Sequence, residues 1–252
     1  MPGLYTDLVK RQHQKQKSLA VLINPDQLDQ VADTLRLISF SVQQQIDYFL
    51  VGGSLITTNN LGEVIRTIKE ECTIPVILFP GSNLYIEAGA DAILLLSIIS
   101  GRNPDLLIGQ HVVAAPILKR SPLEIMATGY ILVNTGQVAS ATYLSHTTPI
   151  PADKASVAAC TAMAGEMLGL KLIYLDAGPE AERSIDSKMI SAVRKAVDVP
   201  LIVGGGINNR YKATRAYEAG ADLLVLDSLE HSADWLPEVA EVTRQQNRKS
   251  AD

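Results

Sequence analysis

Eight short apolar runs, distributed along almost the whole chain, constrain its fold more than any other feature of the sequence. Each run is rich in Val, Ile and Leu and is apolar throughout, which is typical of parallel strands that are covered on both faces. The runs span residues 19–23, 48–51, 75–79, 92–96, 131–133, 172–175, 201–203 and 223–226. We therefore expect a parallel sheet with its strands at these positions.

Segments with helical periodicity separate most of these runs. They span residues 27–44, 61–71, 104–118, 154–168, 187–197, 210–219 and 232–246. Strand–helix alternation predicts right-handed crossovers, and so many repeats favour a closed (β/α)8 TIM barrel, an α/β fold, over an open doubly wound sheet. Two units differ. Residues 83–88 leave room for only a turn or two of helix, and the polar connection over 134–152 is long enough to predict an active-site lid or substrate wall.

Length and charge narrow the function classes. The 252 residues fit one barrel, which we place at 18–246 behind a lead-in helix over 1–17. The net charge of −5, without a dense Lys/Arg stripe, argues against nucleic-acid binding. No secretory signal or long apolar segment is evident, so we predict a cytoplasmic protein. The two cysteines and four histidines lack metal-ligand spacing, which predicts no zinc site.

Polar residues follow the first two predicted strands. In a barrel, catalytic groups lie where strands end, and here these positions hold Asn24, Asp26 and, after a glycine pair, Ser54. They can point into the barrel mouth, where Ser54 can contact a phosphate or join a metal shell. Equally, Asn24 and Asp26 can cap a helix, and Ser54 can cap the helix after a tight turn.

The last three strands end in further candidate groups. Strand alternation places Tyr174 and Asp176 on one side, where the carboxylate can take a proton from a hydroxyl or serve as a paired structural acid. The glycines at 204–206 expose backbone N–H groups ahead of a helix, as in the phosphate site of many barrels. The final strand ends in Asp227 and Ser228, where a phosphate site normally has glycine.

The combination of these segments is similar to a known family. The chain resembles the geranylgeranylglyceryl phosphate synthases and related prenylglyceryl phosphate synthases, in particular their larger group. The resemblance covers roughly residues 18–230, and its matching stretches are 20–26, 48–55, 77–83, 97–111, 128–130, 147–154, 164–178 and 203–207.

This resemblance implies a (β/α)8 barrel that transfers a prenyl group from an allylic prenyl diphosphate to the C3 hydroxyl of sn-glycerol 1-phosphate, with Mg2+. It also implies a homo-oligomer. The metal ligands would be Asn24, in place of the first acid of an Asp-Pro-Asp/Asn motif, and Ser54. Asn24 lacks the charge that helps to hold Mg2+, and Asp26, at the second motif position, is the alternative ligand.

The resemblance also implies an acceptor site and a tail channel. Asp176, which would accept the hydroxyl proton, and Tyr174 are the catalytic residues that the resemblance implies, and Tyr130 and Tyr174 would line the prenyl channel. The residues expected around glycerol phosphate are Tyr174, Leu175, Asp176, Ala177, Gly178, Gly205, Gly206, Asp227 and Ser228. Pro179, which has no N–H to donate, and Glu180 also depart from the family pattern.

These departures leave three hypotheses open. The first is the family reaction. In the second, a repurposed homologue uses a prenyl diphosphate with a non-phosphorylated acceptor, or cyclises or hydrolyses it. In the third, the chain is a non-catalytic homologue that binds a ligand or a partner.

Overall fold

The computed structural model describes residues 3–27, 31–82, 85–136, 140–178, 181–227 and 232–250. It confirms the barrel. Its parallel strands are β1 (Ser18–Ile23), β2 (Tyr48–Gly53), β3 (Val76–Pro80), β4 (Ala92–Ile98), β5 (Glu124–Asn134), β7 (Leu172–Asp176), β8 (Leu201–Gly204) and β9 (Leu223–Asp227). Pairing of β9 with β1, and of β4 with β5, closes the sheet into a ring. A two-residue strand, β6 (Ile150–Pro151), adds to the end of β5.

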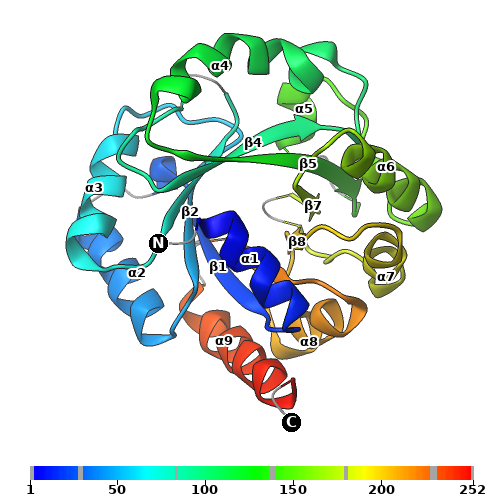
Figure 1. The fold of residues 1–252 in the computed structure, drawn as a ribbon. Coiled ribbons are helices and arrows are strands. Elements are labelled where there is room, and N and C mark those ends of the chain that lie inside the picture. Colours follow the sequence, from blue (N-terminus) through cyan, green and yellow to red (C-terminus); the bar gives the residue numbers. More distant parts are fainter. Residues whose placement is uncertain are drawn as a thin grey trace.

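Helices surround this ring of strands, and one further helix, α1 (Leu4–His13), lies across its opening (Figure 1). The surrounding helices are α2 (Val31–Gln43), α3 (Leu61–Glu71), α4 (Gln110–Arg120), α5 (Ser140–Ser145), α6 (Ala155–Met167), α7 (Ser187–Ala196), α8 (Arg210–Ala219) and α9 (Ser232–Lys249). Between β3 and β4, the residues that the structure describes form no helix, in keeping with the short unit predicted there. No helix in the described ranges is long and apolar enough to cross a membrane.

Two apolar clusters explain why the strands are apolar throughout. One face of each strand packs against the surrounding helices. The opposite face fills the barrel interior, where Tyr48, Leu50 and Met126 are buried. Burial on both faces removes the alternation of polar and apolar residues that a half-exposed strand would show.

Helix α1 closes the N-terminal end of the barrel. Its Leu8 is buried in the interior cluster, and its Asp7 accepts a hydrogen bond from the Tyr48 hydroxyl at 2.9 Å. The backbone N–H groups of Leu4 and Tyr5 donate to the Glu124 carboxylate at the start of β5. With this end covered, ligands reach the interior from the carboxyl ends of the strands.

Several predicted boundaries were wrong. Strand β5 begins at Glu124 rather than at 131, because its register with β4 extends the ladder through polar residues. The helix expected over 104–118 begins as predicted, with a π-helical turn (Asp105–Gly109) followed by α4, and it continues to Arg120. The helix expected from 27 begins, within the described residues, at Val31 and follows a 3₁₀ turn (Pro25–Gln27). The 134–152 connection contains α5 and β6.

Candidate active site

A polar pocket opens at the carboxyl ends of the strands. Residues of β1, β2, β3, β5, β7 and β9 and of α5 contribute to its wall. The predicted site residues among them are Asn24, Ser54, Tyr130, Tyr174, Asp176, Gly178, Gly205 and Asp227. The barrel therefore brings together residues that lie far apart in the sequence.

Asp176 lies buried in this pocket at the end of β7. The Tyr130 hydroxyl, from the neighbouring strand β5, donates to one of its carboxylate oxygens. The Gly178 N–H donates to the other at 2.8 Å. Burial raises the pKa of Asp176, while the bonds from Tyr130 and Gly178 act to lower it. A fixed carboxylate with a raised pKa is a suitable general base for a hydroxyl proton.

Three aromatic rings, those of Phe79, Tyr130 and Tyr174, contact one another in the wall of the same pocket. The centroids of Tyr130 and Tyr174 lie 5.2 Å apart in an edge-to-face arrangement, and Phe79 lies 5.8 Å from Tyr130 and 5.6 Å from Tyr174. Burial raises the pKa of both tyrosine hydroxyls well above the ordinary value, and the nearby Asp176 adds to this effect. Both hydroxyls therefore stay protonated near neutral pH.

The glycine turn after β8 leaves backbone N–H groups available. Gly205 and Gly206 have φ angles of +81° and +68°, a conformation that strains other residues. A Cβ on Gly205 would also lie 2.7 Å from the Gly178 carbonyl oxygen. In the described part of the chain, no acceptor takes the N–H groups of Gly205, Gly206 and Ile207. Successive unpaired amides ahead of a helix, here α8, form a site for an anion.

Only two of the three residues expected at a metal line the pocket. Asn24 and Ser54 line the pocket, whereas Asp26 does not. Its carboxylate accepts bonds from the N–H and hydroxyl groups of Thr57 and Thr58, at 2.6–3.0 Å. Asp26 thus stabilises the loop after β2, and both of its carboxylate oxygens are used in that role.

The donor set still fits a magnesium ion that is held mainly by phosphate groups. The described residues contain no group of three or more His, Cys, Asp or Glu side chains that could bind a metal. Asn24 and Ser54 offer neutral oxygens, and the Asp227 carboxylate lines the same pocket. Mg2+ commonly takes one or two protein oxygens and completes its shell with phosphates and water.

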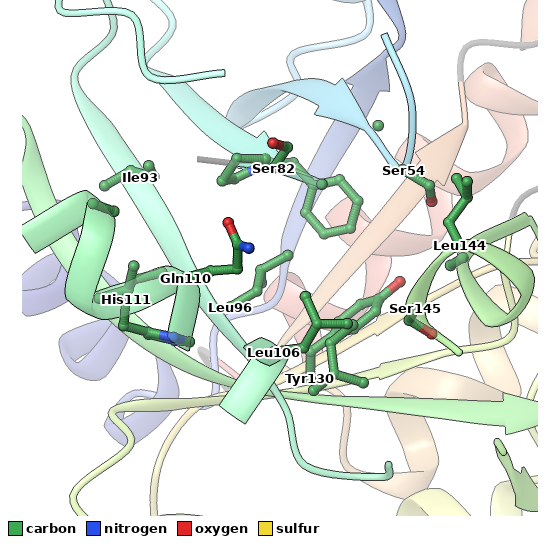
Figure 2. A pocket seen from close by; sticks show the side chains of 18 of the residues that line it. Ser54, Ser82, Ile93, Leu96, Leu106, Gln110, His111, Tyr130, Leu144 and Ser145 are labelled. Carbon is green, nitrogen blue, oxygen red and sulfur yellow. The ribbon is translucent and has the colours of Figure 1, made fainter. Parts of the chain in front are cut away.

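A second, apolar pocket adjoins the first (Figure 2). It extends between β3, β4, the π-helical turn and α4, and its apolar lining includes Ile86, Ile93, Leu95, Leu96, Ile98, Leu106, Ala114 and Leu118. Figure 2 shows Ile93 and His111 at the end of this pocket away from Ser54 and Leu144. The two pockets share Gly53, Ser54, Phe79, Tyr130 and Leu144, which we call the shared wall.

Other predicted residues lie outside the pockets. Leu175 and Ala177 face the outer core, and Gly206 packs against the backbone of residues 181–183. Ser228, like Pro179 and Glu180, falls outside the described residues.

Sequence reasoning missed most of the apolar pocket and also Leu144 and Tyr143, which line the polar pocket from α5. The only signal for these two was the length of the 134–152 connection, which predicted a substrate wall.

Known proteins match the chain over nearly its whole length. A protein of Spirosoma linguale named geranylgeranylglyceryl phosphate synthase is 54% identical, over 92% of this chain and 93% of the relative. A Pyrococcus furiosus protein of the same name is 38% identical, over 89% of each. The solved structure of (S)-3-O-geranylgeranylglyceryl phosphate synthase from Thermoplasma acidophilum, in complex with its substrate sn-glycerol-1-phosphate, superposes with a TM-score of 0.90 at 26% identity, covering 97% of this chain and 100% of that one. Residues 11–243 match the PcrB family, and the chain therefore belongs to that family.

Proposed function

We propose that this protein is a prenyltransferase that moves a prenyl group from a prenyl diphosphate to the C3 hydroxyl of sn-glycerol 1-phosphate. The observation that carries this proposal is that the polar pocket, which contains the glycine turn and the buried Asp176 carboxylate, adjoins the apolar pocket at Tyr130. The names of close relatives support the same reaction. They do not favour a changed acceptor or a non-catalytic homologue.

The acceptor fits the polar pocket by charge and by hydrogen bonding. Its phosphate would bind the N–H groups of Gly205, Gly206 and Ile207, which find no acceptor among the described residues, because clustered backbone amides favour a dianion. Gly205 and Asp176 line the same pocket, so the glycerol part can reach from the glycine turn to the carboxylate. There the hydroxyl proton has an acceptor.

The donor fits across the shared wall. Its hydrocarbon tail would occupy the apolar pocket, where Leu96, Leu106 and Ile93 exclude water. Its diphosphate would lie near Ser54 and Asn24, which line the polar side. The reactive carbon then lies beside Tyr130, between tail and acceptor.

Magnesium would be held by the oxygens of Asn24 and Ser54, with the diphosphate supplying most of the charge. When bound, Mg2+ offsets the negative charge of the departing diphosphate. We do not assign Asp26 to the metal, because the bonds from Thr57 and Thr58 occupy both carboxylate oxygens.

The reaction then follows from these positions. The bond between the prenyl carbon and the diphosphate oxygen breaks, and the acceptor hydroxyl oxygen forms a bond to that carbon. The hydroxyl proton passes to the Asp176 carboxylate, which Tyr130 and Gly178 hold in place. The ring faces of Tyr130 and Tyr174 can stabilise positive charge on the allylic group.

The direct test is an assay of purified protein with Mg2+, prenyl diphosphates of several lengths and radiolabelled sn-glycerol 1-phosphate. We expect a phosphoglycerol ether, and we expect Asp176→Asn to lower kcat by roughly 10²–10⁴-fold, as for other general bases. Asp186→Asn, at an exposed helix cap, is the matched control. Release of diphosphate without an ether product would contradict the proposal.

We also infer a cytoplasmic homo-oligomer. Exposed apolar side chains on α4 and α6 support self-association, since Val112 is 65% exposed and Met167 is 79% exposed. Light scattering of the purified protein tests this inference, and a monomer at micromolar concentration would contradict it.

A further inference from the structure

Lys212, in the first turn of α8, connects two loops at the rim of the polar pocket. Its ammonium group donates to the carbonyl oxygen of Glu182 at 3.0 Å, after β7. It also donates to the carbonyl oxygen of Gly206 and to the Asn208 side chain, both at 2.9 Å, after β8. An ammonium group has three donors, so all of them are used to hold the two loops together.

These loops are in close contact where Lys212 joins them. A Cβ on Gly206 would lie 2.7 Å from the Ala181 carbonyl oxygen and 2.8 Å from the Arg183 carbonyl carbon. The same two loops supply Gly178 and Gly205 to the polar pocket. A change in their spacing would therefore change the width of the pocket at the glycine turn.

The contact with Gly206 also orients a backbone amide. In a trans peptide, the carbonyl oxygen and the following N–H point in opposite directions. Because the Gly206 carbonyl faces Lys212, the Ile207 N–H points away from Lys212. That N–H is one of the amides of the turn that have no acceptor within the described ranges. A turn with two glycines at positive φ has high backbone conformational entropy when it is not held. The hydrogen bond from Lys212 to the Gly206 carbonyl reduces that entropy.

The charge of Lys212 lacks a counterion in the described structure. Among the described residues, it forms no ion pair with a carboxylate, and its three acceptors are neutral. Burial lowers the pKa of Lys212, because it destabilises the charged ammonium group. A nearby anion would stabilise that charge.

We propose that Lys212 is a positioning residue for the phosphate group of the acceptor. It fixes the glycine turn for anion binding, and its charge, which no described carboxylate pairs, is balanced by the bound phosphate. This inference rests on the proposed function, since it assigns the glycine turn to glycerol phosphate. Lys212 acts through Gly206 and Asn208 and need not touch the substrate.

The test compares Lys212→Met, Lys212→Arg and Lys188→Met. Lys188 is a matched control, because it is an exposed lysine in the first turn of α7. For each protein we would measure the Kd of sn-glycerol 1-phosphate and of inorganic phosphate by calorimetry. The KM of both substrates, kcat and the melting temperature would be measured in parallel.

We expect Lys212→Met to raise the Kd and KM for glycerol phosphate by roughly tenfold, as the loss of one nearby charge would, with the KM for prenyl diphosphate nearly unchanged. Lys212→Arg keeps the charge but not the geometry of three acceptors, and should give a smaller increase. Unchanged phosphate affinity in both variants would overturn the inference. Equal increases in the KM of both substrates, together with a lower melting temperature, would also overturn it.

The calorimetric measurement separates this inference from the proposed function. A parent protein that binds glycerol phosphate but makes no ether contradicts the prenyl transfer, and the Lys212 comparison can still be made on binding alone. A parent protein that makes the ether, with Lys212→Met equally active at limiting glycerol phosphate, contradicts only the role of Lys212.

Discussion

The Tyr130 hydroxyl donates a hydrogen bond to the carboxylate of Asp176, and so a side chain of β5 holds the proposed base on β7. This bond acts to lower a pKa that burial raises. Asp176 must be charged to accept a proton, so activity is lost as the pH falls through its pKa. Removing the bond in Tyr130→Phe raises this pKa further, and activity is then lost at a higher pH.

We therefore expect the acidic limb of the pH profile of kcat/KM to move up by about one pH unit in Tyr130→Phe. Tyr211→Phe, which removes a hydroxyl from a side chain that is 73% exposed, should leave the profile in place. An unchanged limb in Tyr130→Phe would show that the bond does not set the ionisation of the base.

Replacement of Asn24 tests the magnesium site. Asn24→Asp keeps an oxygen that can accept the Asp26 N–H and adds a negative charge to the pocket. We expect the Mg2+ concentration for half-maximal activity to fall by roughly tenfold, because ligand charge sets the affinity for hard cations. Asn59→Asp adds the same charge at an exposed residue and should have no effect. Equal Mg2+ dependence of the two variants would count against Asn24 as a ligand.

A pair of glycine variants separates loss of the anion site from backbone strain. Gly205→Ala places a methyl group 2.7 Å from the Gly178 carbonyl oxygen at a φ of +81°, whereas Gly169→Ala has a φ of +92° and nothing within 4 Å. Both should lose about 1 kcal/mol of stability or more. Only Gly205→Ala should raise the KM for glycerol phosphate, which initial-rate kinetics would measure. An equal KM in both would place the phosphate elsewhere.

Filling the apolar pocket should change which prenyl diphosphates are accepted. Ala114 is buried on α4 and lines the pocket, so a tryptophan there would shorten the space for a tail. We expect Ala114→Trp to lose activity with long prenyl diphosphates, to retain it with short ones, and to keep its KM for glycerol phosphate. Ala115→Trp, at the next and exposed residue, is the control. Equal losses at all tail lengths would argue against a tail in this pocket.

Much of the fold could be predicted because burial on both faces leaves a local signal. In a strand such as β7 (Leu172–Asp176), the ends of the short apolar sequence mark the ends of the strand. Strand β5 was predicted too short because Glu124, Thr128 and Gly129 interrupt its apolar pattern. Its true length is set by the register with β4, which is a tertiary contact.

The site could be predicted only in part for the same reason. Tyr174 and Asp176 follow from strand alternation, and the glycine turn follows from its composition. The hydrogen bonds of Asp26 come from Thr57 and Thr58 in another loop, so its position could not be inferred locally. Lys212 has no local feature that separates it from a surface lysine, and the apolar pocket exists only after α4 packs beside β3 and β4.

Residues of the shared wall and residues that line only the apolar pocket differ in how far their sequence can change without loss of activity. Gly53, Ser54, Phe79, Tyr130 and Leu144 face both pockets, so mutations there would affect both reactants at once. Positions such as Ile93 and Ala114 face the apolar pocket alone. Descendants of this sequence could therefore evolve new tail preferences there while the chemistry at Asp176 is inherited unaltered.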